Sequence, residues 1–208
     1  MTGGAVGGSG VTTTGQGAVT AAPDVAVVEL GAESSAPGVQ EALDRANTGL
    51  AAARDALVAA GVDAADVRTS QTSTWTEQRD DGPRTTARLT LRATVRDVAA
   101  CGEIVRAALD AAGPVARLDS TSLAVGDPGP LAVAARDAAF ADARSRAEQY
   151  ARLAGRSLGP VVEVREDAGG PGPMPRLMAA KAASDALVVE PGTQEVRASV
   201  TVRWELAD

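Results

Sequence analysis

Residues 134–155 read AARDAAFADARSRAEQYARLAG, a run in which alanine returns every three or four residues. Five alanines spaced four residues apart form a stripe: Ala135, Ala139, Ala143, Ala147 and Ala151. This period is that of one side of an α-helix, and small side chains there let a helix lie close to a sheet. Charged pairs one turn apart, such as Arg144 and Glu148, contribute only about 0.2–0.5 kcal/mol each. The stripe therefore predicts a helix that packs on a sheet through its alanines.

Other segments alternate apolar and polar residues with the two-residue period of half-buried β-strands. They include residues 25–33, residues 87–97 and, near the end of the chain, residues 193–206. The sequence RDDGPR at 79–84 contains the Asp-Gly and Pro residues of a turn. It predicts a β-hairpin that joins residues 67–78 to the second alternating segment.

Two further segments, 38–60 and 98–112, carry apolar residues at three- and four-residue spacing. This spacing predicts amphipathic helices, and Gly61 and Gly113 follow them where C-terminal caps belong. With three main helices and about seven strands, the chain is predicted to be α+β, with a mainly antiparallel or mixed sheet.

Three glycine-rich stretches interrupt this pattern. Residues 1–10 are predicted to be a flexible leader, and residues 168–194 a Gly-, Pro- and Met-rich insert in a single domain over 11–208. The Gly-Gln-Gly at 15–17 is too short for a dinucleotide-binding fingerprint. It predicts a bend or bulge between two strand segments.

The composition limits the chemistry that the protein can perform. Among 208 residues, 45% are hydrophobic, which suffices for a sizeable core, but none is a histidine. The usual general base at neutral pH and the commonest transition-metal ligand are therefore missing. Cys101 is the single cysteine and lies on an apolar helix stripe, where a thiol is usually buried and inert. We expect no enzymatic activity, no catalytic residue, no metal and no cofactor.

Charge and hydropathy bear on partners and location. The formal net charge of −7 disfavours binding to nucleic acid. The first residues, MTGGAVGGSG, have neither the basic region nor the apolar region of a secretory signal, and no apolar stretch of about 18 residues could span a bilayer. On these grounds we expect a cytoplasmic protein without a transmembrane segment.

Arg88, Arg92 and Arg96 form the strongest electrostatic pattern, because strand alternation directs all three side chains to one face. One interpretation is a site for a small anion or metabolite. The other is a solvated face on which these arginines meet carboxylates of neighbouring strands.

The most hydrophobic part of the loop-like insert consists of Met174, Pro175, Leu177 and Met178. A plain surface loop is one interpretation. A contact with another protein is the other, because methionine adapts to irregular surfaces. The contact would most simply join copies of this chain in a homo-oligomer.

Six motifs in this order resemble the SIMPL-domain family, and the resemblance spans about residues 11–206. They are GQGAVTAAPDVAVVELGAE, ALVAAGV, DVRTSQTS, LTLRATVRDV, ARDAAFADARSRAEQYARLAGRSLG and VEPGTQEVRASVTVRWEL. The resemblance implies a β-β-α-β-β-α-β-α-β-β order, self-assembly into large ring-like or hollow oligomers, and a link to stress tolerance. Many bacterial members are exported to the cell envelope, and the family has no catalytic residues to carry over.

Two hypotheses for the function follow. The first is a non-enzymatic structural or scaffold protein, related to stress, that assembles with itself into a large homo-oligomer. The alternative is a small-anion or metabolite-binding domain that uses the arginine-lined strand face.

Overall fold

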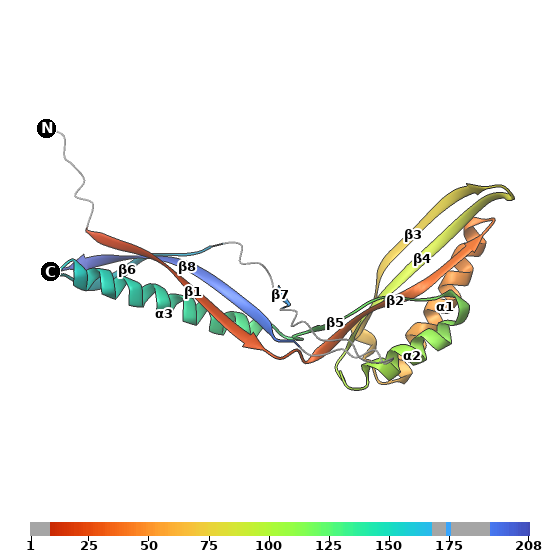
Figure 1. Cartoon of the computed structure of the whole chain (residues 1–208), viewed down its shortest axis with the longest axis horizontal. Coiled ribbons are helices and arrows are strands. Elements are labelled where there is room, and N and C mark those ends of the chain that lie inside the picture. Colours follow the sequence, from red (N-terminus) through yellow and green to blue (C-terminus); the bar gives the residue numbers. More distant parts are fainter. Residues whose placement is uncertain (1–8, 168–173, 176–191) are drawn as a thin grey trace, which may run out of the picture. The chain divides into compact units, whose positions relative to one another are not determined.

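The computed structural model describes residues 9–167, 174–175 and 192–208 of the chain (Figure 1). Its helices are α1 (Val39–Ala59), α2 (Cys101–Ala112) and α3 (Gly129–Leu153), with short 3-10 turns η1 (Ala64–Asp66) and η2 (Gly113–Val115). Its strands are β1 (Gly10–Ala21), β2 (Val25–Ala36), β3 (Val67–Arg79), β4 (Gly82–Val95), β5 (Ala116–Ala124), β6 (Ser157–Glu166), β7 (Met174–Pro175) and β8 (Gln194–Ala207). All described strand pairs are antiparallel, so the predicted α+β class with three main helices is confirmed.

The described residues separate into two compact units, each with its own sheet. Unit 1 contains β1, α3, β6, β7 and β8, and unit 2 is the continuous segment 23–126. The predicted domain of residues 11–208 thus contains both units. Most of the predicted leader and most of the predicted insert lie outside the described residues.

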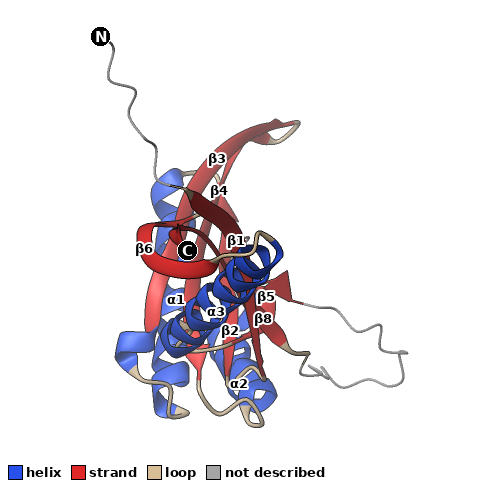
Figure 2. Cartoon of the chain, turned by 90° about the vertical axis from the view of Figure 1, so that its left-hand side faces the viewer, coloured by secondary structure: helices blue, strands red, loops and turns tan. Residues whose placement is uncertain are grey.

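In unit 1 the sheet has the order β1-β8-β6, with β7 also paired to β8, and α3 packs along β1 and β8 (Figure 2). The five alanines of the predicted stripe are the buried residues of α3. They face Val200, Val202 and Trp204 of β8, which alternate toward the helix. The predicted packing of this helix on a sheet is confirmed.

The glycines of β1 explain how close the helix comes. A Cβ atom at Gly15 would lie 2.1 Å from the carbonyl oxygen of Ala139, and one at Gly17 would lie 2.0 Å from that of Ala135. The register between β1 and β8 runs without a shift from Gly10 to Ala21. The predicted bend or bulge at residues 15–17 is therefore wrong, because these glycines make room for a helix backbone instead of bending the strand.

In unit 2 the sheet has the order β3-β4-β2-β5, and α1 and α2 cover one face of it (Figure 1). Leu30 of β2 and Leu57 of α1 are among the largest fully buried side chains. Cys101 is buried in the same core, and burial raises the pKa of its thiol. The helix predicted over 98–112 begins at Cys101, because residues 98–100 form a turn in which the Ala100 N–H donates to Asp97 Oδ1 at 3.0 Å.

Candidate functional site

Arg88 and Arg92 of the arginine row lie on the face of the unit 2 sheet that α1 and α2 leave open. β4 turns Leu89, Leu91 and Ala93 into the core, so the alternate side chains point the other way. Arg88 Nη2 lies 2.6 Å from Asp119 Oδ1, and Arg96 Nη2 lies 3.0 Å from Asp66 Oδ2. Arg92 Nη1 lies 3.5 Å from Glu29 Oε1. Arg88 and Arg92 thus lie on the open face of β4, Arg96 follows the end of that strand at Val95, and each of the three arginines pairs with a different carboxylate.

Asp119 is the centre of this arrangement. Its carboxylate accepts hydrogen bonds from Arg88, Arg117 and Thr90, and its side chain is only 15% exposed. Burial alone would raise the pKa of Asp119, but the hydrogen bonds from Arg117 and Arg88 outweigh it, and the pKa lies below its usual value. The hydrogen bond to Asp119 in turn raises the pKa of Arg117.

Arg117 and Asp119 were missed by the sequence-based search. They lie two residues apart in a strand-like segment, which is a weak signal for a network. Arg117 also pairs with Glu33 of β2 at 2.7 Å. Four arginines thus pair with four carboxylates, so an incoming anion would have to compete with Asp119, Glu29, Asp66 and Glu33. Anion binding by the row stays a prediction.

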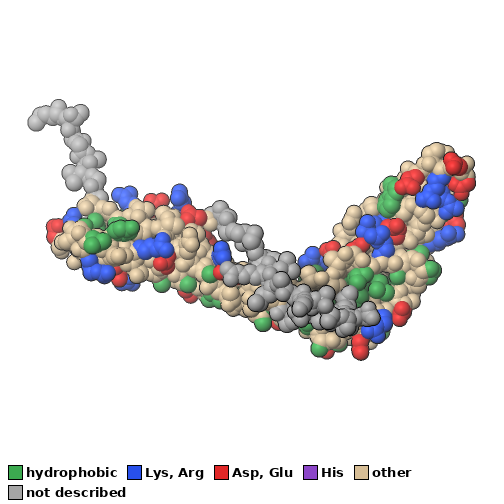
Figure 3. Space-filling model, in the orientation of Figure 1, with side chains coloured by type: hydrophobic (Ala, Val, Ile, Leu, Met, Phe, Trp, Pro, Cys, Tyr) green, Lys and Arg blue, Asp and Glu red, His purple; other side chains and the backbone are tan. Residues whose placement is uncertain are grey.

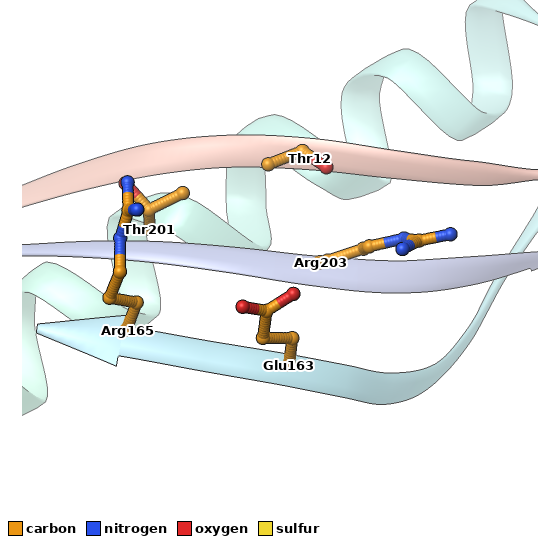
Figure 4. Close-up of a pocket in the computed structure, with 5 residues that line it drawn as sticks. All are labelled: Thr12, Glu163, Arg165, Thr201 and Arg203. Carbon is orange, nitrogen blue, oxygen red and sulfur yellow. The ribbon is translucent and has the colours of Figure 1, made fainter.

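The open face of the unit 1 sheet carries a shallow polar depression of about 180 Å³ (Figure 4). Thr12 comes from β1, Thr201 and Arg203 come from β8, and Glu163 and Arg165 extend from β6 toward β8. On the face shown in Figure 3, arginine and carboxylate side chains are interspersed in the same way. The depression is an exposed charged surface of both signs.

The outer edge of β1 is covered by side chains of α3. The Gln16 N–H donates to Asp142 Oδ2 at 2.9 Å, and Arg146 Nη1 donates to the Thr14 carbonyl oxygen at 3.1 Å. The hydrogen bond from the Gln16 backbone is the main cause that lowers the pKa of Asp142. Arg146 and Asp142 also pair with each other at 2.9 Å. These two residues therefore occupy backbone groups that another strand would need for pairing.

An apolar surface of unit 1 lies on β6. Val161, Val162 and Val164 of β6 are 44%, 51% and 54% exposed. Beside them runs a groove with Arg144 and Glu148 at its rim, lined by Phe140, Leu158, Gly159, Pro160, Val161 and Trp204. We call this the α3–β6 groove. Its sequence signal was the run PVVEV, and the register shift between Val161 and Glu163 interrupts the strict alternation of β6 at Val162.

The predicted oligomer contact falls largely outside the described residues. Met174 and Pro175 form β7, whose backbone pairs with Glu195 and Gln194 of β8. Leu177 and Met178 lie beyond the described part of the chain. The role of these four residues stays a prediction.

Within the described ranges, no group of three or more Cys, Asp and Glu residues is placed to hold a metal ion. The helices described for this chain include none that is long and apolar enough to cross a membrane.

Two relatives of this chain are named as periplasmic proteins. The chain is 28% identical over 214 residues to the 26 kDa periplasmic immunogenic protein of Brucella melitensis biotype 1, and the same holds for the protein of that name from Brucella abortus strain S19. The match covers 94% of this chain and 84% of each relative. The expected cytoplasmic location is therefore wrong, because the proteins that the chain resembles are periplasmic.

The family comparison covers nearly the whole chain. Residues 11–204 match the SIMPL family, which is described as a protein of unknown function, DUF541. This range covers the three helices and nearly all strand residues described in the two units. The resemblance inferred from the order of six motifs is confirmed, and the chain belongs to the SIMPL family.

Proposed function

We propose that this protein is a non-catalytic structural protein of the bacterial cell envelope that assembles with itself into a large, ring-like or hollow homo-oligomer. The observation that carries this proposal is the apolar surface of β6 beside the α3–β6 groove. Contiguous exposed apolar surface usually marks a site of protein contact. The proposal includes no bound cofactor and no nucleic-acid partner, in keeping with the net charge of −7.

A second copy of the chain is a fitting partner for this surface. Fully burying a valine contributes about 1.5–3 kcal/mol, so covering three half-exposed valines would contribute on the order of 1 kcal/mol from each. Arg144 and Glu148 at the rim carry opposite charges, so the same surface on another copy brings no large block of one sign. Trp204 and Phe140 form the floor of the groove with ring centroids 6.3 Å apart.

Light scattering after size-exclusion chromatography tests the assembly. The expected mass is a large multiple of the 20.8 kDa chain, and electron microscopy of the same sample is expected to show closed particles. A Val162→Glu, Val164→Glu variant is expected to lower the mass. Val39→Glu is the matched control, because Val39 is 49% exposed on α1 of unit 2. A monomer of the unmodified chain at micromolar concentration would contradict the proposal.

Export is a separate part of the proposal and rests on the periplasmic relatives. The protein produced from its natural gene in its source bacterium is expected in the envelope fraction, beside a periplasmic marker enzyme. A deletion strain is expected to lose tolerance of envelope stress and to regain it on complementation. Recovery of the protein with the cytosolic marker would contradict the location.

A further inference from the structure

The open edges of the two sheets differ in how far they are protected from pairing with another strand. The edge of β1 is occupied by Asp142 and Arg146. β6 contains Pro160 and two register shifts, and β5 contains a register shift and the charged residues Arg117 and Asp119. Charges, prolines and bulges are the usual means by which proteins protect an edge.

β3 has one register shift, at Ser70, but its charged residues stand only near its two ends. It pairs with β4 and with no other described strand, and nearly all of its 13 residues are exposed. The eight consecutive residues 69–76, TSQTSTWT, carry no charge and include Trp75, which is 39% exposed. A long, exposed, uncharged edge is a template for the addition of another strand.

The ladder between β3 and β4 shows that the charges of β3 are arranged symmetrically. Ser73 lies opposite Arg88, and Ser70 is left out of the ladder at a register shift. Arg68 lies opposite Arg92 and Glu77 lies opposite Arg84, so each is four ladder positions from Ser73, on opposite sides of it. Residues separated by an even number of ladder positions share a face of the sheet, so Arg68, Ser73 and Glu77 point to the same side.

An antiparallel copy of the same strand fits this arrangement. With Ser73 opposite Ser73 of the second copy, Arg68 of each copy lies opposite Glu77 of the other. The pairs between them are Thr72 with Thr74, Gln71 with Trp75 and Thr69 with Thr76, which are uncharged and able to hydrogen-bond or stack. No like charges oppose each other in this register.

The surroundings of Arg68 favour such a partner. Arg68 forms no ion pair with a described carboxylate, and its neighbour across the ladder is another arginine, Arg92. Among the described residues, Glu77 pairs only with the exposed Arg79, at 3.3 Å. A second strand would therefore bring a carboxylate to a place where two arginines lie side by side.

We propose that β3 pairs antiparallel with β3 of a second copy of this chain, about a two-fold axis at Ser73. This interface rests on the proposed self-assembly and would be one contact of the oligomer. It extends the sheet of unit 2 across the two copies.

Disulfide trapping tests the register. Residues directly opposite in an antiparallel pair have Cα atoms about 4.5–5.5 Å apart, which a disulfide can bridge. The Ser73→Cys variant is therefore expected to form a covalent dimer of twice the 20.8 kDa chain under mild oxidation. Thr76→Cys is the matched control, because position 76 lies opposite position 69 and is expected to stay monomeric on the same gel. Cys101 is buried and does not interfere.

Charge reversal tests the same register without oxidation. Arg68→Glu and Glu77→Arg each place like charges opposite each other at two symmetric positions. Each is expected to weaken self-association by about tenfold or more. The double variant Arg68→Glu, Glu77→Arg restores opposite charges and is expected to associate like the unmodified chain.

The outcomes separate this inference from the proposed function. An unmodified chain that is monomeric overturns both. An unmodified chain that is oligomeric, with no Ser73→Cys dimer and no effect of the single reversals, overturns the β3 interface and leaves self-assembly standing. Trapping by Ser73→Cys together with rescue by the double reversal supports the interface.

Discussion

Gly15 and Gly17 show how single residues set the distance between elements. Their missing side chains let the α3 backbone rest on β1, while the alanine stripe fills the space beside them. A glycine at such a place has a steric role that periodicity alone does not distinguish from a turn or a bulge.

Gly15→Ala is expected to destabilise the protein by about 1–3 kcal/mol or more, because its Cβ would overlap backbone atoms of α3 that cannot move aside cheaply. Gly102→Ala is the matched control. No atom lies within 4 Å of its Cβ position in α2, so it is expected to stabilise the helix by about 0.5–1 kcal/mol. Urea denaturation measures both. Equal effects of the two substitutions would contradict the close approach.

Asp119→Asn is expected to cost about 1–3 kcal/mol at pH 7, because Arg88 and Arg117 lose a charged acceptor. The pKa of Asp119 is lowered in the folded state. The contribution of Asp119 to the free energy of unfolding is therefore complete above the pKa of an aspartate in the unfolded chain, about 3.9. It disappears as the pH falls through the pKa of Asp119 in the folded state.

The difference in unfolding free energy between Asp119→Asn and the unmodified protein should accordingly shrink below about pH 4. Asp55→Asn, at an exposed position of α1, serves as the control and is expected to change little. A difference that stayed constant down to pH 2 would show that the ion pairs of Asp119 are not its cause.

At the scale of elements, α3 has two tasks in unit 1. Its buried stripe forms the core against β1 and β8, and its polar side closes the β1 edge through Asp142 and Arg146. The helix was predicted from its period, but its contact with the strand edge was not, because Gln16 and Asp142 are 126 residues apart in sequence.

Asp142→Ala is expected to speed hydrogen exchange of the Gln16 amide by at least about tenfold, since an edge amide without an acceptor is open to water. The double variant Arg144→Ala, Glu148→Ala is the control. Its residues pair with each other on the same helix, at 3.0 Å, and neither is hydrogen-bonded to β1. Unchanged protection of the Gln16 amide in Asp142→Ala would contradict the covering of this edge.

At the scale of the whole molecule, unit 2 has the features of an inserted unit. Its described residues form one continuous segment with its own core. The two ends of this segment lie together: the Asp24 N–H donates to the Ala124 carbonyl at 3.1 Å and the Gly126 N–H donates to Asp24 Oδ1 at 2.7 Å. Unit 1 is built from segments on both sides of it.

Residues 23–126 expressed alone are therefore expected to fold and to unfold cooperatively. Residues 127–208 alone are expected not to fold, because they lack β1, on which α3 packs. Circular dichroism and amide spectra of the two fragments check this. A disordered 23–126 fragment would show that its core depends on the rest of the chain.

Much of the fold could be predicted from local pattern. The alanine period of α3, the alternation of β2, β4 and β8 and the glycine caps depend on neighbours within a few residues, so they are readable in the sequence. The candidate sites were harder to predict from the sequence. The arginine row was identified, but its partners Glu29, Asp66 and Asp119 come from other elements.

The sequence by itself determined the elements, the α+β class and the family, because period and motif order are properties of the linear chain. Only the tertiary structure decided that the strands form two sheets, that Gly15 and Gly17 admit a helix, and that β1 is covered while β3 is open. These features depend on which distant segments meet. A local pattern allows several such pairings, and the packing of the complete chain selects among them.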